Sequence, residues 1–228
     1  DLAFEDYVVR TEPTNRVGAG FTMKRLSELY YGESAALGDL NKDGRMDIIS
    51  GPLWFEGPDF RKSHEISVPV SGNIGWSYTE FGGAEVFDWT GDGWPDVLAT
   101  ESRQMVLYVN PKGEPRRWTR HLVVPGVTSE LTLLEDVDGD GRPELVFTKE
   151  GMVVFARYDP ADATKPWVTN VISGEGLTTF HGLGVGDVNG DGRKDILAAA
   201  GWWEQPAAGP SGPWAYHQQA FARWSRSE

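Results

Sequence analysis

Short apolar runs alternate with turn residues along most of the chain. Apolar runs of a few residues, bounded by Gly, Pro, Asn and Asp, are typical of β-strands joined by tight turns. Apolar positions at helical spacing never extend beyond about two turns. The best helix candidate is the short segment from Met23 to Tyr30. The pattern therefore predicts an all-β fold.

One eleven-residue pattern occurs four times without gaps, and its starts lie 49, 48 and 51 residues apart. A short strand of small and apolar residues precedes each copy. A second strand, an aromatic segment and a further strand follow it. A period near 50 residues with four strands per unit is typical of a β-propeller blade. The copies are DLNKDGRMDII from Asp39, DWTGDGWPDVL from Asp88, DVDGDGRPELV from Asp136 and DVNGDGRKDIL from Asp187.

The strand count does not balance. The fourth-strand pattern occurs five times if Tyr7–Arg10 and Tyr216–Phe221 are included, whereas the first three strands occur four times. Because an unpaired strand leaves an exposed edge, we expect four blades plus one extra N-terminal strand, within a larger ring. Either missing blades or a second chain would close that ring. We expect residues 1–228 to form one propeller or partial propeller, with repeats at about 33–70, 82–125, 130–173 and 181–221.

The repeated loop resembles half of an EF-hand but lacks its last ligand. Position twelve, where an EF-hand has a bidentate Glu, holds no carboxylate in any copy, and the residues after position nine favour a strand. Side-chain oxygens at positions one, three, five and nine, with a carbonyl at seven, still suit a hard cation. Glycine at position six permits the sharp turn. The alternative is a plain Asx-rich β-turn.

The loops predict up to four calcium sites, of which the second is the weakest because Thr90 stands at position three. The predicted ligands are Asp39, Asn41, Asp43, Arg45 and Asp47; Asp88, Thr90, Asp92, Trp94 and Asp96; Asp136, Asp138, Asp140, Arg142 and Glu144; and Asp187, Asn189, Asp191, Arg193 and Asp195.

The formal net charge is -13, and the loops contain many of the carboxylates. A nucleic-acid partner is not expected, because such a partner needs a basic face. The chain has no cysteine, so disulfides and thiolate zinc sites are excluded. No apolar run approaches the length of a membrane-spanning helix, and no secretory signal is visible at Asp1.

With four in-phase loops, the chain resembles the FG-GAP, or VCBS-type, repeats of integrin α-subunit propellers and many bacterial secreted proteins. This resemblance covers nearly the whole chain. It implies a propeller, usually seven-bladed, with calcium between strands one and two of each blade. More narrowly, SGPLWFEGPDF, and HGLGVGDVNGDGRKDIL followed by GWWEQP, are similar to bacterial propeller proteins related to aldos-2-ulose dehydratase. Since calcium is abundant outside the cell, we expect an extracellular or periplasmic protein.

A ligand of a propeller usually lies at the mouth of the central channel, at the end opposite the cation loops. The residue six before each loop marks this end of the innermost strand, and the connections between strands two and three also reach it. The residues placed there are Glu33, Gly82, Glu130 and His181, with Glu101, Arg103, Lys149 and Glu150, and with Trp76, Tyr78 and Glu80 from NIGWSYTEFGG.

This set suggests acid–base chemistry on a sugar. His181 would act as base or metal ligand, and Glu33 and Glu130 as acid–base groups or ligands of a further divalent metal in the channel. Arg103 or Lys149 would stabilise an oxyanion. Trp76, Tyr78, Glu80 and Glu101 would bind the ligand. The alternative is that all are ordinary solvated groups at strand ends.

Three functions remain open. The first is a secreted calcium-binding propeller that binds a carbohydrate or protein ligand at its channel mouth. The second is a carbohydrate lyase or dehydratase that uses the residues at that mouth. The third is a structural repeat module of a larger surface protein. Trp54, Phe55, Trp202 and Trp203 recur in phase with the blades, which favours a role in packing between blades over sugar binding.

Overall fold

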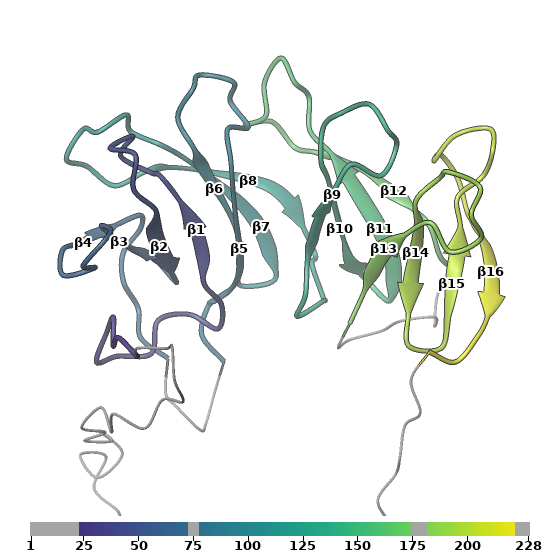
Figure 1. Cartoon of the computed structure of the whole chain (residues 1–228), viewed down its shortest axis with the longest axis horizontal. Coiled ribbons are helices and arrows are strands. Elements are labelled where there is room, and N and C mark those ends of the chain that lie inside the picture. Colours follow the sequence, from purple (N-terminus) through teal and green to yellow (C-terminus); the bar gives the residue numbers. More distant parts are fainter. Residues whose placement is uncertain (1–22, 73–77, 175–181, 222–228) are drawn as a thin grey trace, which may run out of the picture.

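The computed structural model describes residues 23–72, 78–174 and 182–221, which form four antiparallel four-stranded sheets (Figure 1). The prediction of an all-β fold with four-stranded blades is confirmed. The best helix candidate, Met23–Tyr30, has no regular secondary structure. The extra strand predicted at Tyr7–Arg10 lies outside the described residues, and the number of blades in a complete ring stays a prediction.

Each sheet is a meander of consecutive strands, so each blade is continuous in sequence. The first blade contains β1 (Ala36–Gly38), β2 (Asp47–Ser50), β3 (Leu53–Phe55) and β4 (Ser63–Glu65). The second contains β5 (Phe81–Phe87), β6 (Asp96–Glu101), β7 (Gln104–Val109) and β8 (Thr119–Pro125). The third contains β9 (Leu133–Glu135), β10 (Glu144–Lys149), β11 (Met152–Arg157) and β12 (Val168–Val171). The fourth contains β13 (Gly184–Gly186), β14 (Asp195–Ala198), β15 (Gly201–Glu204) and β16 (Ala215–Gln218).

The blades stand side by side in chain order, with the first and fourth blades at opposite ends of the row (Figure 1). One hydrophobic core lies between each pair of neighbours. In the second blade, Val97 and Tyr108 face the first blade, whereas Leu98 and Leu107 face the third. Successive side chains of a strand point to opposite faces of the sheet. Both faces of this sheet are therefore buried, which explains its continuous apolar runs.

The repeating aromatic residues belong largely to these cores, as predicted. Trp54 packs between the first and second blades, and Trp203 packs between the third and fourth. Phe55 and Trp202 are also buried. No helix in the described part of the chain is long and apolar enough to cross a membrane.

Polar side chains also join neighbouring blades. Asn110, just after β7, donates Nδ2–H bonds to the carbonyl of Leu40 in the first blade (3.0 Å) and to that of Pro95 (2.8 Å). Gln205, just after β15, makes the matching bond to the carbonyl of Val137 in the third blade (2.7 Å). Leu40 and Val137 each stand at position two of a repeated loop. These loops are therefore part of the contact between blades.

Candidate functional site

The four repeated loops share one backbone conformation, which their first aspartate holds. The carboxylate of Asp39 accepts hydrogen bonds from the N–H groups of Asp43 (3.0 Å) and Gly44 (2.9 Å). Asp88, Asp136 and Asp187 accept bonds from the matching part of their loops. The glycine at position six has a φ of 83° to 87° in every loop, in the left-handed region that favours glycine.

The carboxylate at position nine is buried and ties its loop to the third strand. Asp47 is 0% exposed and accepts bonds from the N–H groups of Leu40 (2.8 Å) and Gly57 (2.9 Å). Asp96, Asp195 and Glu144 bond to the N–H at the start of their own loops in the same way. Burial raises the pKa of Asp47 and Asp96 and raises that of Glu144 to about 7. These positions would therefore gain from a nearby cation.

The third loop gives the densest set of oxygen ligands among the described residues. Asp136, Asp138 and Glu144 each offer a carboxylate oxygen, and these oxygens lie within 4.8 Å of one another. Nη2 of Arg157 lies 2.7 Å from Asp138, so one carboxylate of the loop already has a cationic partner. An all-oxygen donor set is the kind that Ca²⁺ prefers. The side-chain oxygens of the first, third and fourth loops fit such an ion by their donor chemistry, although in the fourth loop the guanidinium of Arg193 pairs with Asp191.

The second loop fits a metal ion less well. Nζ of Lys112 lies 3.0 Å from Oδ2 of Asp92. The Thr90 hydroxyl donates to Asp96 at 3.0 Å. Burial by itself would raise the pKa of Asp92, but the hydrogen bonds from Lys112 and from the N–H of Trp94 outweigh it, and that pKa is lowered. Three of the predicted side-chain ligands, Thr90, Asp92 and Asp96, thus have protein partners.

The residues predicted at the channel mouth have separate partners. Oε1 of Glu33 accepts a bond from the N–H of Thr79 at 2.8 Å. Glu101 accepts bonds from the Tyr108 hydroxyl (3.0 Å) and from Nε of Arg120 (2.9 Å), so its side chain lies toward the outer strand β8.

The remaining predicted residues lie on turns and strand ends. Arg103 has a φ of 63° in the β6–β7 turn, and Lys149 ends β10. Glu130 and Tyr78 are exposed, and the carbonyl of Glu80 accepts a bond from the N–H of Ser102. His181 and Trp76 lie outside the described residues. The site at the channel mouth, and a metal ion within it, therefore stay predictions.

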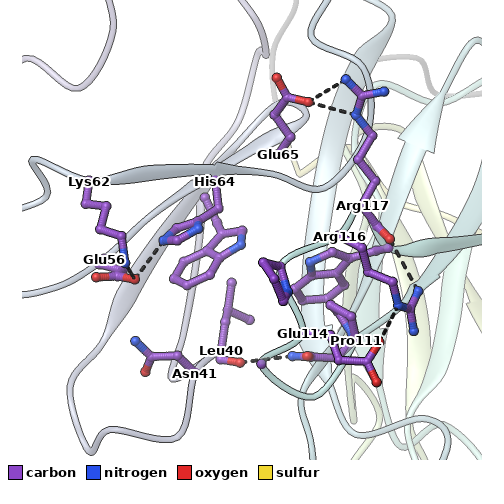
Figure 2. Close-up of a pocket in the computed structure, with 15 residues that line it drawn as sticks. Leu40, Asn41, Glu56, Lys62, His64, Glu65, Pro111, Glu114, Arg116 and Arg117 are labelled. Carbon is purple, nitrogen blue, oxygen red and sulfur yellow. Dashed lines mark hydrogen bonds and ion pairs between the residues drawn. The ribbon is translucent and has the colours of Figure 1, made fainter.

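A groove of about 650 Å³ opens between the first two blades, a site that the sequence did not predict (Figure 2). One wall comes from β3, β4 and the first repeated loop, and the other comes from the segment between β7 and β8. Trp54 and Trp118 are only 8% and 7% exposed, so they form a buried floor with little ring surface free. The residues that line the groove are Leu40, Asn41, Trp54, Glu56, Lys62, His64, Glu65, Asn110, Pro111, Gly113, Glu114, Pro115, Arg116, Arg117 and Trp118.

The wall of the first blade is built around His64. Its imidazole stacks on Trp54, with the ring centroids 4.1 Å apart and an interplanar angle of 14°. Nε2 of His64 lies 2.7 Å from Oε1 of Glu56, and Nζ of Lys62 lies 2.7 Å from the same oxygen. The bonds from Lys62 and His64 lower the pKa of Glu56 despite its partial burial. The imidazole is therefore fixed on both its face and its edge.

Ion pairs also organise the rest of the groove (Figure 2). Nε of Arg116 lies 2.8 Å from Glu114, and Nη2 of Arg117 lies 2.6 Å from Glu65, a residue of the first blade. The Arg117–Glu65 pair joins the two walls. Leaving the imidazole aside, the cationic side chains Lys62, Arg116 and Arg117 are each matched by a carboxylate. The groove is thus strongly polar but close to neutral in charge.

The sequence did hold one signal for this arrangement. In the first blade, Trp54 is followed two residues later by Glu56 and then by His64 in the outer strand. The fourth blade repeats this pattern with Trp202, Glu204 and His217. There the rings are stacked at 4.3 Å, and Nε2 of His217 lies 2.7 Å from Glu204. The spacing from Glu to His differs between the two blades, which hides the repeat from a gapless comparison.

Residues 136–198 match the FG-GAP-like repeat family. This stretch is similar to an FG-GAP-like repeat. The resemblance of the repeated loops to this family is thereby confirmed over the third loop, the third blade and the fourth loop. A search of curated proteins finds no match for the chain.

Two solved structures share the arrangement of repeated four-stranded sheets. One is an Agrocybe aegerita lectin described as recognising non-reducing terminal N-acetylglucosamine, with a TM-score of 0.51, 17% identity and coverage of 77% of this chain and 49% of that one. The other is BBS1N in complex with ARL6DN, with a TM-score of 0.50, 14% identity and coverage of 85% and 58%. At this identity the likeness shows the fold. The chain spans about half the length of these structures.

Proposed function

We propose that this protein is a calcium-stabilised β-propeller that binds a neutral carbohydrate in the groove between its first two blades. The observation that carries the proposal is the groove of about 650 Å³, in which charged side chains form matched pairs over a buried apolar floor. Ligand pockets typically measure about 300–1,000 Å³. The groove therefore has the volume of a small-molecule site.

The charge balance of the groove favours a sugar over an ion. An anionic ligand would be repelled by Glu56, Glu65 and Glu114, and a cationic ligand by the basic side chains opposite them. A sugar hydroxyl both donates and accepts hydrogen bonds. It can therefore accept from an arginine N–H and donate to the paired carboxylate without breaking the pair. The sugar class is argued from this chemistry, and the lectin with a similar fold agrees with it.

Calcium and the sugar would meet at the first loop. Asn41, a predicted calcium ligand, also lines the groove. A calcium ion held by Asp39, Asn41, Asp43 and the Arg45 carbonyl would neutralise this loop and fix the wall that Asn41 belongs to. Modest calcium affinity suffices where calcium is near millimolar. We therefore place the protein outside the cytosol, in an extracellular or periplasmic setting.

The test is a calorimetric titration of the protein with N-acetylglucosamine and a panel of other neutral monosaccharides, in calcium. Arg116→Ala and Glu56→Gln each remove a charged hydrogen-bonding group worth about 1.5–3 kcal/mol. We expect each variant to weaken binding about tenfold or more. Glu33→Gln, at the predicted channel mouth, is the matched control and should bind like the parent. If Glu33→Gln loses binding while the groove variants keep it, the ligand binds at the channel mouth. If the parent binds no neutral sugar, the proposed function is wrong.

A further inference from the structure

The second repeated loop is surrounded by cationic side chains. Nζ of Lys112 lies 3.0 Å from Oδ2 of Asp92, the carboxylate at position five of this loop. Lys42, from the first loop, places its Nζ 5.3 Å from the ring centroid of Trp94. The same Nζ lies beside Gly93, 3.8 Å from the position that a Cβ atom would occupy on this glycine. Two ammonium groups thus lie where a divalent cation would be repelled.

The backbone conformation and the hydrogen bonds of Asn110 hold Lys112 in position. Its φ is 57°, a conformation that is uncommon for residues other than glycine. Its N–H donates to Oδ1 of Asn110 at 2.8 Å, and Nδ2 of Asn110 donates to the carbonyl of Pro95 in the second loop at 2.8 Å. Asn110 therefore connects the backbone of Lys112 to the loop that its ammonium group contacts.

The first loop provides the contrast. Over residues 23–72, 78–174 and 182–221, no ion pair involves Asp39, Asp43 or Asp47. In the first loop, the amide of Asn41 stands at position three; in the second, the hydroxyl of Thr90 stands there and donates to the buried Asp96. Both loops donate the backbone N–H groups of positions five and six to their first aspartate, yet of these two loops only the second carries an ammonium on its position-five carboxylate.

We propose that the ammonium group of Lys112 serves as the built-in cation of the second loop, so that this loop keeps its conformation without Ca²⁺. Lys112 neutralises Asp92 from a turn that Asn110 holds in place, and Lys42 adds a second positive charge beside Gly93. Within the part of the chain that the structure describes, the first loop has no such substitute, and it takes the ion. This inference rests on the calcium role proposed above for the repeated loops.

The test counts the calcium ions bound per chain by equilibrium dialysis at millimolar calcium and records melting temperatures with calcium and with a chelator. We expect Asp43→Asn to bind one ion fewer than the parent and Asp92→Asn to bind the same number. Lys112→Met should bind one ion more. It should also melt below the parent in chelator and gain more from calcium than the parent does.

Lys165→Met is the matched control, since Lys165 lies between β11 and β12 of the third blade and pairs with Asp162, outside the repeated loops. It removes the same charge and should leave the count unchanged. Lys112→Gln guards against a misfolded Met variant. The inference is overturned if neither Lys112 variant binds more calcium than the parent, or if Asp92→Asn binds one ion fewer. The Asp43 variant separately tests the proposed calcium role of the first loop.

Discussion

The backbone N–H of Trp118 donates a hydrogen bond to the carbonyl of Ile66 over 3.0 Å, and this bond joins the second blade to the first. Trp167 bonds to Val123 at 2.9 Å and Trp214 to Ile172 at 3.0 Å in the same way. Each tryptophan stands immediately before the outermost strand of its blade, and its side chain is buried against the preceding blade. In the second, third and fourth blades, one tryptophan thus supplies both apolar area and a backbone bond to the preceding blade.

Trp167→Ala should destabilise the fold strongly. The side chain is 5% exposed, and its indole N–H donates to the carbonyl of Ala163 at 2.9 Å. Truncation of a buried tryptophan typically costs about 3–5 kcal/mol. Urea unfolding should show this loss in the free energy of unfolding. Tyr78→Ala, at a side chain that is 77% exposed, should change it little. A loss at Trp167 no larger than at Tyr78 would show that this contact does not hold the blades together.

Asp96→Ala should also destabilise the fold, even without calcium. The carboxylate is 0% exposed and accepts bonds from the N–H groups of Thr90 (3.1 Å) and Asn110 (3.0 Å). Each buried donor that loses its partner costs about 1–3 kcal/mol. Chemical unfolding in chelator isolates this effect from metal binding. Asp59→Ala, at an exposed turn, is the control. Equal stability of the two variants in chelator would mean that these buried hydrogen bonds to Asp96 do not stabilise the fold.

The blades could be predicted because their pattern is local. Each repeat carries its own loop, with aspartate at position one and glycine at position six, and these residues act on backbone groups a few positions away. Each strand pairs with a strand that is its neighbour in sequence, so the pairing can be predicted from local sequence alone. The helix candidate at Met23–Tyr30 does not form a helix, because a short apolar spacing is not enough without packing support.

The groove could not be predicted because it belongs to two blades at once. The pattern of Trp54, Glu56 and His64 does recur in the fourth blade, but it does not indicate a binding role, since the contacts of His64 depend on how β3 and β4 pair. The opposite wall, with Arg116 and Arg117, lies more than 50 residues further along the chain. Only the packing of one blade on the next brings these side chains together.

The contribution of Glu85 to the stability of the protein should be more favourable in mild acid than at neutral pH. It lies on β5, and burial raises its pKa above the ordinary value of 4.5. The folded state therefore binds this proton more tightly than the unfolded state. The contribution of Glu85 to stability falls as the pH rises from about 4.5 through the raised value.

Glu85→Gln removes this cost, so we expect a higher melting temperature than the parent at pH 7 and a smaller difference at pH 4. Glu28→Gln removes the same charge at an exposed position and serves as the control. If Glu85→Gln changes the melting temperature equally at both pH values, the charged carboxylate of Glu85 does not destabilise the folded state.

Removal of calcium should lower both the stability of the protein and its affinity for a sugar. A site that is occupied at a hundredfold excess over its dissociation constant contributes about 2.7 kcal/mol, which is roughly 5–10 °C in melting temperature for a chain of this size. Sugar affinity should fall because Asn41 belongs both to the first loop and to the groove wall. Calorimetric titration with and without chelator, beside thermal unfolding, measures both effects.

Two loop variants separate these effects. Asp43→Asn, in the first loop, should lower the melting temperature and weaken sugar binding together. Asp136→Asn, in the third loop, removes a carboxylate far from the groove residues in sequence and should lower the melting temperature alone. If Asp136→Asn weakens sugar binding as much as Asp43→Asn does, calcium supports the groove through general stability. If neither variant affects binding, the first loop is not coupled to the groove, and Asn41 contributes only its own side chain to that wall.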